Sequence, residues 1–200
     1  MSTRPKRVLV ACEFSGIVRD AFAARGHDAW SCDLLPTERP GQHIQGDVLT
    51  ILEDGWDVMI AHPPCTYLSR AGARWWKAPG HEEHAQAAAK FVFRLRDAPI
   101  ARIALENPIG QLNQRWRYPD QTIQPWQFGH PYSKATCLWL TNLPHLYPTE
   151  LCPVYTSWLP SNVGYGARRG QRTQRGHVHN ARDASRTFMG IAEAMAEQWG

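Results

Sequence analysis

The sequence lacks several features that would place it in familiar protein classes. Its five cysteines are odd in number and widely spaced, with no CxxC pair: Cys12, Cys32, Cys65, Cys137 and Cys152. This argues against a disulfide framework, so we expect reduced thiols and a cytoplasmic protein of a bacterial or phage-infected cell. The first seven residues are short, polar and basic, so no signal peptide is expected. No apolar run approaches the roughly 20 residues of a membrane span, so no membrane partner is expected.

Two further absences concern metals and repeats. The stretches His81-Glu82-Glu83-His84 and His177-Val178-His179 contain paired histidines, but neither has a cysteine or histidine partner at zinc-site spacing. A helix start and a loop are the simpler interpretations, so we expect no metal. The chain also has no internal repeats.

Positive charge is only mildly in excess overall, with a net charge of +4, which does not by itself identify a nucleic-acid partner. Its distribution is more informative, because residues 167–186 hold a single acid, Asp183. The same segment holds six arginines: Arg168, Arg169, Arg172, Arg175, Arg182 and Arg186. Such a segment can neutralise phosphates.

The pattern along the chain predicts one α/β domain of 200 residues. Apolar runs predict strands over 7–12, 27–32, 44–48, 56–61, 100–105 and 135–140, and helical patterns cover 16–25, 81–97 and 187–199. We expect a long loop over 66–80, an irregular stretch over 111–127 and a loop over 141–166. Strands that alternate with helices indicate a mostly parallel sheet flanked by helices.

The first strand, helix and second strand have the spacing of a nucleotide-binding unit. Ser15 can cap the helix, Gly16 allows close approach of the backbone, and Asp33 follows about twenty residues after the turn. Because this turn contains a single glycine, Gly16, it is not a GxGxxG motif and does not suit a pyrophosphate. A carboxylate at Asp33 suits the two hydroxyls of a ribose.

Cys65 has the most informative surroundings. The apolar stretch 56–61 predicts a buried strand that ends before Pro63-Pro64, because proline cannot continue a central strand. Cys65 follows at once, so its thiol lies where open α/β sheets place their chemistry. A buried structural thiol is the alternative. The rigid turn before Cys65 and the polar stretch after it favour a functional thiol.

Five predicted strands end in groups that can do chemistry. Cys12 and Glu13, Asp33, Asp47, Cys65 and Glu106 follow successive strands, and the carboxyl ends of parallel strands share one edge. A thiolate can add to an electron-poor ring carbon while a carboxyl group supports a ring nitrogen. Cys65 could therefore add to C6 of a pyrimidine, with Glu106 at N3, so that C5 attacks an electrophilic methyl group.

These motifs resemble those of the DNA cytosine-C5 methyltransferase family. The similar stretches are Phe14-Ser15-Gly16, Asp33, Gly46-Asp47-Val48, Pro63-Pro64-Cys65, Glu106-Asn107-Pro108 and the helix that begins near Gly190. The resemblance implies a Rossmann-like class I methyltransferase fold, S-adenosyl-L-methionine as cofactor, and double-stranded DNA as substrate. It also implies that the target cytosine is flipped out of the duplex.

Roles for individual residues follow from these considerations. Catalysis falls to Cys65 and Glu106. The expected cofactor-binding residues are Phe14, Ser15, Gly16, Asp33, Leu34, Asp47, Val48, Pro63 and Gly190. The expected substrate-binding residues are Pro64, Ser69, Arg70, Asn107, Pro108, Arg115, Arg117, Lys134, Arg168, Arg169, Arg172 and Arg175.

The chain also departs from the family. Ile17 and Val18 replace small residues of the first motif, His62 stands where glycine is usual, and Thr66 stands where glutamine is usual. The basic residue that braces the target base is left open between Arg115, Arg117 and Lys134.

The expected domain organisation is one catalytic domain over 1–200. In it, 141–186 forms a reduced, basic recognition segment and 187–200 packs back on the cofactor region. We therefore expect weak or very short sequence specificity. A phage origin is expected, where broad modification protects DNA from restriction.

Several alternatives stay open. His62-Pro63-Pro64-Cys65 also resembles the Asn/Asp-Pro-Pro-aromatic motif of amino-directed methyltransferases. RNA or a free nucleotide could replace DNA, another group could replace methyl, and a non-catalytic relative could simply bind nucleic acid. The loop Arg70–Lys77 either closes over the flipped base or is a solvated surface loop with packed tryptophans. Oligomeric state is not predicted.

Overall fold

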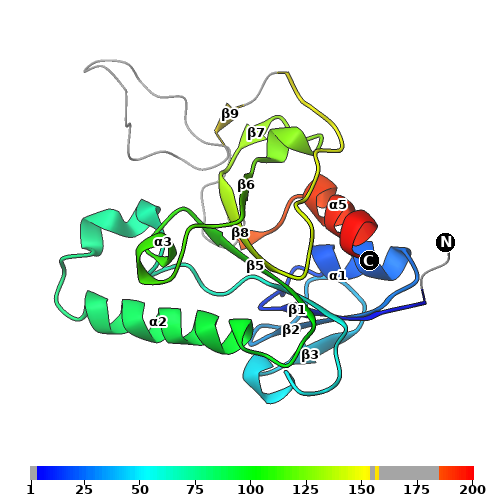
Figure 1. The fold of residues 1–200 in the computed structure, drawn as a ribbon, viewed down its shortest axis with the longest axis horizontal. Helices are drawn as coiled ribbons and strands as arrows, with labels where there is room; N and C mark the ends of the chain where they lie inside the picture. Colours follow the sequence, from blue (N-terminus) through cyan, green and yellow to red (C-terminus); the bar gives the residue numbers. More distant parts are fainter. Residues whose placement is uncertain (1–3, 154–155, 158–184) are drawn as a thin grey trace.

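The computed structural model describes residues 4–153, 156–157 and 185–200, and is built around a seven-stranded sheet (Figure 1). The strand order is β3-β2-β1-β4-β5-β8-β6. The strands are β1 (Arg7–Ala11), β2 (Asp28–Asp33), β3 (His43–Gln45), β4 (Val58–Ala61), β5 (Arg102–Pro108), β6 (Gln121–Ile123) and β8 (Thr136–Thr141). A separate two-stranded sheet pairs β7 (Tyr132–Ser133) with β9 (Thr156–Ser157).

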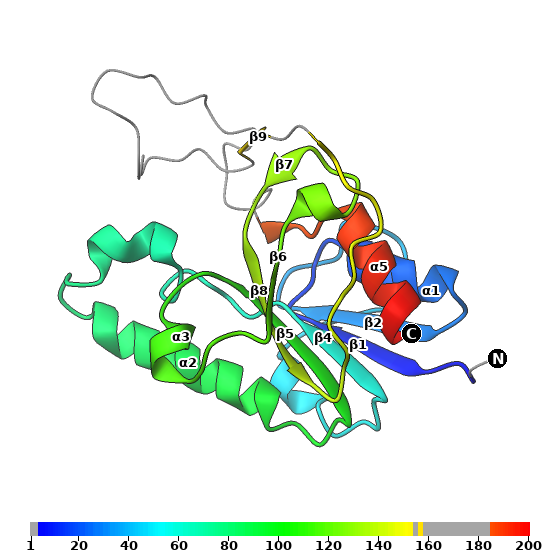
Figure 2. The same ribbon diagram turned by 45° about the horizontal axis from the view of Figure 1, so that its top comes forward.

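The main sheet is parallel except at β8. Strands β3, β2, β1, β4 and β5 pair in parallel, whereas β8 runs antiparallel to both of its neighbours, β5 and β6. Figure 2 shows helices on both sides of this sheet. The predicted Rossmann-like α/β fold, with a mostly parallel sheet flanked by helices, is confirmed.

Two helices cover one face of the sheet and one long helix covers the other. The first pair is α1 (Ile17–Ala24) and α5 (Met189–Trp199), and the opposite helix is α2 (His81–Arg96) (Figure 2). Side chains of β1 alternate between the two cores: Val8 and Val10 pack with α1 and α5, whereas Leu9 packs with α2. Burial on both faces explains why β1 and β4 are continuous apolar runs.

Several expectations for irregular segments were wrong. The predicted loop 66–80 contains the 3-10 helix η2 (Arg70–Trp75). The stretch 111–127 contains α3 (Leu112–Arg115), β6 and the 3-10 helix η3 (Pro125–Gln127). The predicted strand 44–48 ends at Gln45, so Asp47 instead begins the short helix η1 (Val48–Thr50).

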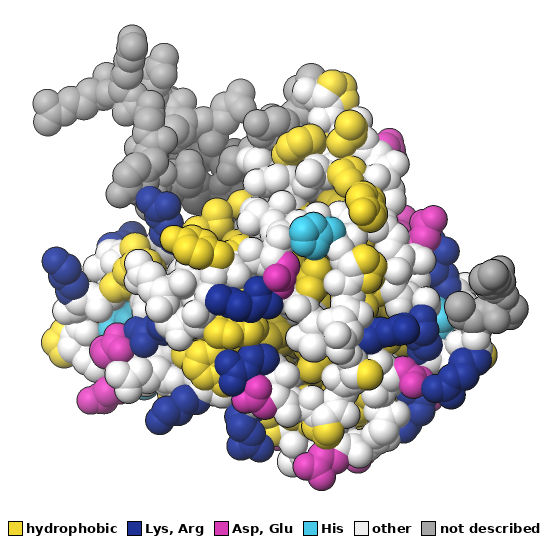
Figure 3. All heavy atoms as spheres, in the orientation of Figure 1, with side chains coloured by type: hydrophobic (Ala, Val, Ile, Leu, Met, Phe, Trp, Pro, Cys, Tyr) yellow, Lys and Arg dark blue, Asp and Glu magenta, His cyan; other side chains and the backbone are white. Residues whose placement is uncertain are grey.

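The described surface carries no single basic face in the view of Figure 3. Lysine and arginine side chains there are interspersed with acidic and apolar ones. The arginines Arg168, Arg169, Arg172 and Arg175 lie outside the described residues. Within the part of the chain that the structure describes, no helix is long and apolar enough to cross a membrane.

Candidate active site

The register of the sheet brings the predicted chemical groups to one edge. Ala11 at the end of β1 lies beside Cys32 of β2 and Ala61 of β4, and Ala61 lies beside Leu105 of β5. The residues that follow these positions therefore start from neighbouring points. They include Cys12, Asp33, His62 and Glu106.

The turn after β1 is closed by a buried carboxylate. Glu13 is 5% exposed, and it accepts hydrogen bonds from the main-chain N–H of Val18 at 2.7 Å and of Arg19 at 3.2 Å. The N-cap residue is Gly16 rather than Ser15, whose hydroxyl accepts the Ile17 N–H at 3.3 Å. Because a protein carboxylate occupies the positive end of α1, this turn has no free anion site for a pyrophosphate.

Position 16 requires glycine for a steric reason. Its φ is +72°, and a Cβ there would lie 2.5 Å from the Arg19 side chain. Arg19 is 1% exposed and donates to the carbonyl oxygens of Arg39 and Pro40 and to the hydroxyl of Thr37. This buried guanidinium therefore fastens the loop after β2 against α1. The Phe14 carbonyl oxygen accepts the Glu38 N–H of the same loop at 2.8 Å.

Asp33 and Asp47 lie at the carboxyl ends of β2 and β3, on the side of β1 away from β4 and β5. One oxygen of Asp33 accepts the Leu35 N–H at 2.9 Å, and one oxygen of Asp47 accepts the Leu49 N–H at 3.0 Å. Burial, and next the charge of Asp33, raise the pKa of the Cys12 thiol to about 12, with smaller contributions from Cys32 and Asp47. Both carboxylates thus act on the partly exposed Cys12 thiol, so the three groups share one region.

Two residues predicted to bind cofactor differ in exposure. Leu34 is 73% exposed beside Asp33, whereas Val48 is 4% exposed and packs in the core against α2. A third, Gly190, packs against Phe128, because a Cβ at Gly190 would lie 2.0 Å from the Phe128 carbonyl oxygen.

The Pro-Pro-Cys turn is tied directly to the end of β5. The Asn107 Nδ2 donates to the Pro63 carbonyl oxygen at 2.8 Å, and Asn107 is 1% exposed. Pro63 is buried and Pro64 exposed. The Cys65 carbonyl oxygen accepts the N–H groups of Leu68 at 3.0 Å and Ser69 at 2.8 Å, which forms a tight turn. Cys65 itself is partly exposed.

The Glu106 carboxylate belongs to the same cluster. Its Oε2 lies 3.0 Å from the His62 Nδ1. Burial raises the pKa of the Cys65 thiol most, and the Glu106 charge raises it further, while Lys134 opposes both. Burial also raises the pKa of Glu106, but His62 and Lys134 together bring that pKa below its ordinary value. Thiol, carboxylate, imidazole and ammonium therefore interact at one place.

The three basic residues left open by the sequence occupy different positions. Arg115 forms a two-pronged ion pair with Glu82, at 2.6 and 3.0 Å, and Arg117 pairs with Asp120 at 2.7 Å. Lys134 precedes β8, whose antiparallel pairing with β5 sets Thr136 beside Pro108. That pairing brings Lys134 to the carboxyl end of β5, where its charge acts on both Cys65 and Glu106.

The loop after Cys65 rests on the loop after Glu106. Ser69 forms an isolated bridge with Gly110, and the Arg70 N–H donates to the Ile109 carbonyl oxygen at 2.9 Å. Ser69 also caps η2, where its hydroxyl accepts the Ala71 N–H at 3.2 Å. Within η2 the Trp75 side chain is 56% exposed. Main-chain contacts thus join Ser69 and Arg70 to Gly110 and Ile109, which directly follow Pro108.

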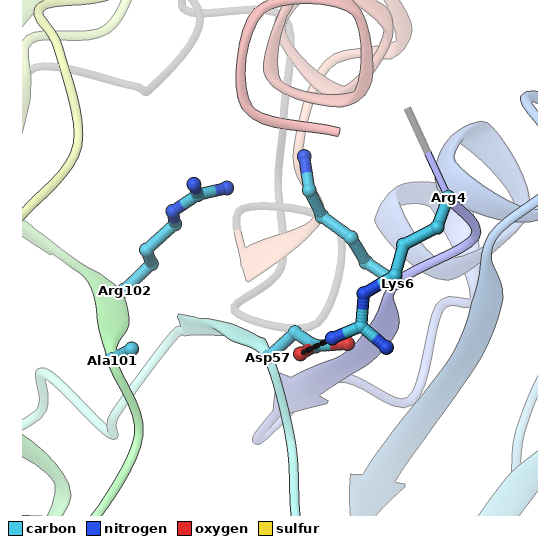
Figure 4. A pocket seen from close by; sticks show the side chains of 5 residues that line it. All are labelled: Arg4, Lys6, Asp57, Ala101 and Arg102. Carbon is cyan, nitrogen blue, oxygen red and sulfur yellow. Dashed lines mark hydrogen bonds and ion pairs between the residues drawn. The ribbon is translucent and has the colours of Figure 1, made fainter. Parts of the chain in front are cut away.

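A hollow of about 360 Å³ lies at the opposite edge of the sheet (Figure 4). Its lining comes from the amino ends of β1 and β5 and the residue before β4: Arg4, Lys6, Asp57, Ala101 and Arg102. None of the predicted site residues lines it. No group of three or more metal-binding side chains occurs among the described residues.

Sequence reasoning missed three features of this site. It did not identify the capping role of Glu13, the contact of His62 with Glu106, or the bond from Asn107 to Pro63. The available signal was sequence position: His62 directly precedes Pro63-Pro64-Cys65, and Asn107 directly follows Glu106.

Comparison with known proteins gives only a distant similarity. No protein-family model matches the chain, and no curated protein sequence matches it. Among solved structures it is similar to an E. coli prophage-encoded protein provisionally described as a DNA modification methyltransferase, with 15% sequence identity and a TM-score of 0.45. The similarity covers 75% of this chain and 53% of that chain, so this chain spans about half of that protein's length.

Proposed function

We propose that this protein transfers a methyl group from S-adenosyl-L-methionine to C5 of cytosine in DNA, through a covalent bond between Cys65 and C6. The observation that carries this proposal is the joint placement of Cys65 and Glu106. The two loops are tied by the Asn107–Pro63 bond of 2.8 Å, and the Glu106 charge acts on the Cys65 thiol. A nucleophile and a carboxylate in contact with one ring are what attack at a pyrimidine C6 requires.

The neighbouring half of the edge fits the cofactor. Asp33 and Asp47 each use one oxygen to cap a local turn, which holds the carboxylates in fixed orientations for ribose and adenine groups. Glu13 fills the positive end of α1, so the turn disfavours a phosphate-bearing cofactor and tolerates a cationic one. When bound, S-adenosyl-L-methionine supplies an electrophilic methyl group. Phe14, Ser15, Gly16, Leu34, Pro63 and Gly190 remain proposed cofactor-binding residues.

Cys65, Glu106 and Lys134 each have a defined task at the ends of β4 and β5. The Cys65 thiol gives its proton to solvent and its sulfur bonds to C6, while Glu106 supplies a proton to N3. After transfer, the C5 proton passes to solvent, the S–C6 bond breaks to release the Cys65 thiolate, and N3 returns its proton to Glu106. Among the three basic candidates we favour Lys134 as the brace, since it acts on both Cys65 and Glu106, whereas Arg115 and Arg117 hold Glu82 and Asp120.

The proposed substrate is double-stranded DNA with the cytosine flipped out, because a stacked base cannot reach Cys65. Pro64, Ser69, Arg70, Asn107 and Pro108 line the route or hold the site. The arginine-rich segment 167–186 supplies phosphate contacts rather than base readout. We therefore propose low or very short sequence specificity. Protection of phage DNA from restriction would suit such an enzyme.

Methylation of an exocyclic amino group is the main alternative, since it needs no thiol. Cys65 separates the two reactions. The test is a covalent trapping assay with S-adenosyl-L-methionine and duplex DNA that carries 5-fluorocytosine. Fluorine at C5 blocks the final proton loss, so the adduct survives denaturation. Cys65→Ala is the test variant. Cys152→Ala is the matched control, because Cys152 is also a partly exposed cysteine, but its main-chain N–H donates to the Trp126 carbonyl oxygen.

An adduct that requires both the cofactor and Cys65, and that persists in Cys152→Ala, supports the proposal. Methyl transfer to ordinary DNA that survives Cys65→Ala refutes the C5 reaction and favours amino methylation. Retention of DNA binding with neither adduct nor transfer, on DNA, RNA and free nucleotides alike, refutes an enzymatic role and favours a binding protein.

A further inference from the structure

His62 is fixed in place by the sheet itself. It is the first residue after β4, and its main-chain N–H donates to the Ala11 carbonyl oxygen at 2.9 Å. This bond continues the pairing between β4 and β1 beyond the end of β4. The main chain of His62 is therefore hydrogen-bonded like that of a strand residue, which fixes the position of its Cα.

The His62 imidazole contacts the Glu106 carboxylate. Its Nδ1 lies 3.0 Å from the Glu106 Oε2, and the side chains of His62 and Glu106 are 9% and 18% exposed. Within the described residues, the His62 Nε2 is buried and has no hydrogen-bond partner. A side chain with one polar atom unsatisfied carries a free-energy cost, so a purely structural role explains it poorly.

The charges around Glu106 keep it ionised. Burial raises its pKa, but the hydrogen bond from His62, the His62 charge and the Lys134 charge together lower it. The thiols of Cys65 and Cys137 also face the pair, since the charge of Glu106 contributes to the raised pKa of each. A carboxylate in this state accepts a hydrogen bond readily, but it has no proton to give to a ring nitrogen.

We propose that His62 is a positioning residue that orients Glu106 and stores the proton which Glu106 delivers to N3 of the target base. This inference rests on the proposed function. As the S–C6 bond forms, His62 in its imidazolium form passes its Nδ1 proton to Glu106 Oε2 and becomes a neutral imidazole, and Glu106 gives one proton to N3. When the S–C6 bond breaks, N3 returns its proton to Glu106 and the carboxyl group returns one to His62. No proton is gained or lost by the pair over the cycle.

One test is independent of any substrate. The protonation of Glu106 is followed by carboxyl-labelled NMR, with Glu106→Gln identifying the signal, in the wild type and in His62→Asn. The asparagine Nδ2 can replace the Nδ1 donor but cannot carry an extra proton. Because His62 lowers the pKa of Glu106, we expect Glu106 to protonate at higher pH in His62→Asn. An unchanged titration overturns the inference. His62→Ala, which removes both donor and charge, replaces His62→Asn if that variant does not fold.

The second test uses the adduct assay at several pH values. In His62→Asn we expect adduct formation at pH 8 to slow by about 10²-fold, as for the loss of a general acid, with unchanged dependence on DNA concentration. The rate should recover as the pH falls and Glu106 becomes protonated directly. His27→Asn is the matched control, because His27 lies at the opposite edge of the sheet, where it contacts the Lys6 N–H.

The outcomes separate the two proposals. A loss of equal size at every pH, together with an unchanged Glu106 titration, makes His62 a structural residue. No adduct in the wild type refutes the cytosine reaction and with it the delivery of the proton to N3. The Glu106 titration then still decides whether His62 controls that carboxylate.

Discussion

The bond from Asn107 to Pro63 connects the loop of Cys65 with the end of β5, so its removal tests how the site is held together. We predict that Asn107→Ala destabilises the fold modestly and slows adduct formation strongly. The donor Nδ2 lies 2.8 Å from the Pro63 carbonyl oxygen in a buried setting. Without it, the carbonyl oxygen loses its partner and the two loops can separate.

The expected size follows from three contributions. The lost hydrogen bond is worth about 1 kcal/mol, and the unpaired buried carbonyl costs about 1–3 kcal/mol more. Within the described residues the Asn107 Oδ1 is itself buried without a partner, so the wild type already carries a similar cost that alanine removes. The net loss of unfolding free energy should therefore be about 1–2 kcal/mol. Adduct formation should fall by about 10²-fold, because a displacement near 1 Å has that effect on catalysis.

The free energy is measured by urea unfolding, and the rate by covalent trapping. Asn142→Gly is the matched control. Asn142 donates to the Ala101 carbonyl oxygen at the same 2.8 Å distance, but in an exposed turn with φ of 52° that glycine tolerates. Its loss should cost less than about 1 kcal/mol, because water replaces the lost partner. An Asn107→Ala protein that matches the wild type in both stability and rate refutes the link between the loops.

Three further perturbations follow from the same contacts. Burial and then Glu106 raise the pKa of Cys65, so Glu106→Gln should lower that pKa and speed alkylation at pH 8 by up to about tenfold, as measured by mass spectrometry. A slower reaction would contradict the assigned sign. Glu13→Ala leaves two main-chain N–H groups of α1 without their buried acceptor and should cost about 2–4 kcal/mol in urea unfolding, whereas a loss below about 0.5 kcal/mol would contradict the cap. Gly190→Ala places a Cβ against the Phe128 carbonyl oxygen and should cost about 1–3 kcal/mol in urea unfolding, and an unchanged stability would contradict the close packing of Gly190 against Phe128.

The strand ends were predictable because a parallel sheet buried on both faces leaves a simple signal. Apolar runs at 7–12 and 56–61 correspond to β1 and β4, and the groups after them do meet at one edge. Strand β5 was harder, since it runs three residues beyond the predicted end at Leu105. Those residues pair with β8, which arrives from about thirty residues later in the chain, and local sequence carries no trace of such pairing.

Polar contacts inside the site were less predictable for a different reason. The segment 121–123 has only one buried side chain, Ile123, so its strand depends on pairing with β8. Likewise, Glu13, His62 and Asn107 act through single hydrogen bonds to partners fixed only by the fold. Composition and spacing can place such residues near a site. They cannot say which polar atoms meet.

The charges of the edge divide it into two unlike halves. Three carboxylates make one half acidic, which suits the proposed cofactor with its cationic centre. Glu13 lies after β1, Asp33 ends β2, and Asp47 caps η1 after β3. Beyond β4 the carboxylate of Glu106 is accompanied by His62 and by the positive charge of Lys134, so that half is less acidic and suits the target base. Cys65 lies between them, after β4. A nucleophile at the boundary between these two halves lies where the two proposed substrates, the cofactor and the target base, would meet.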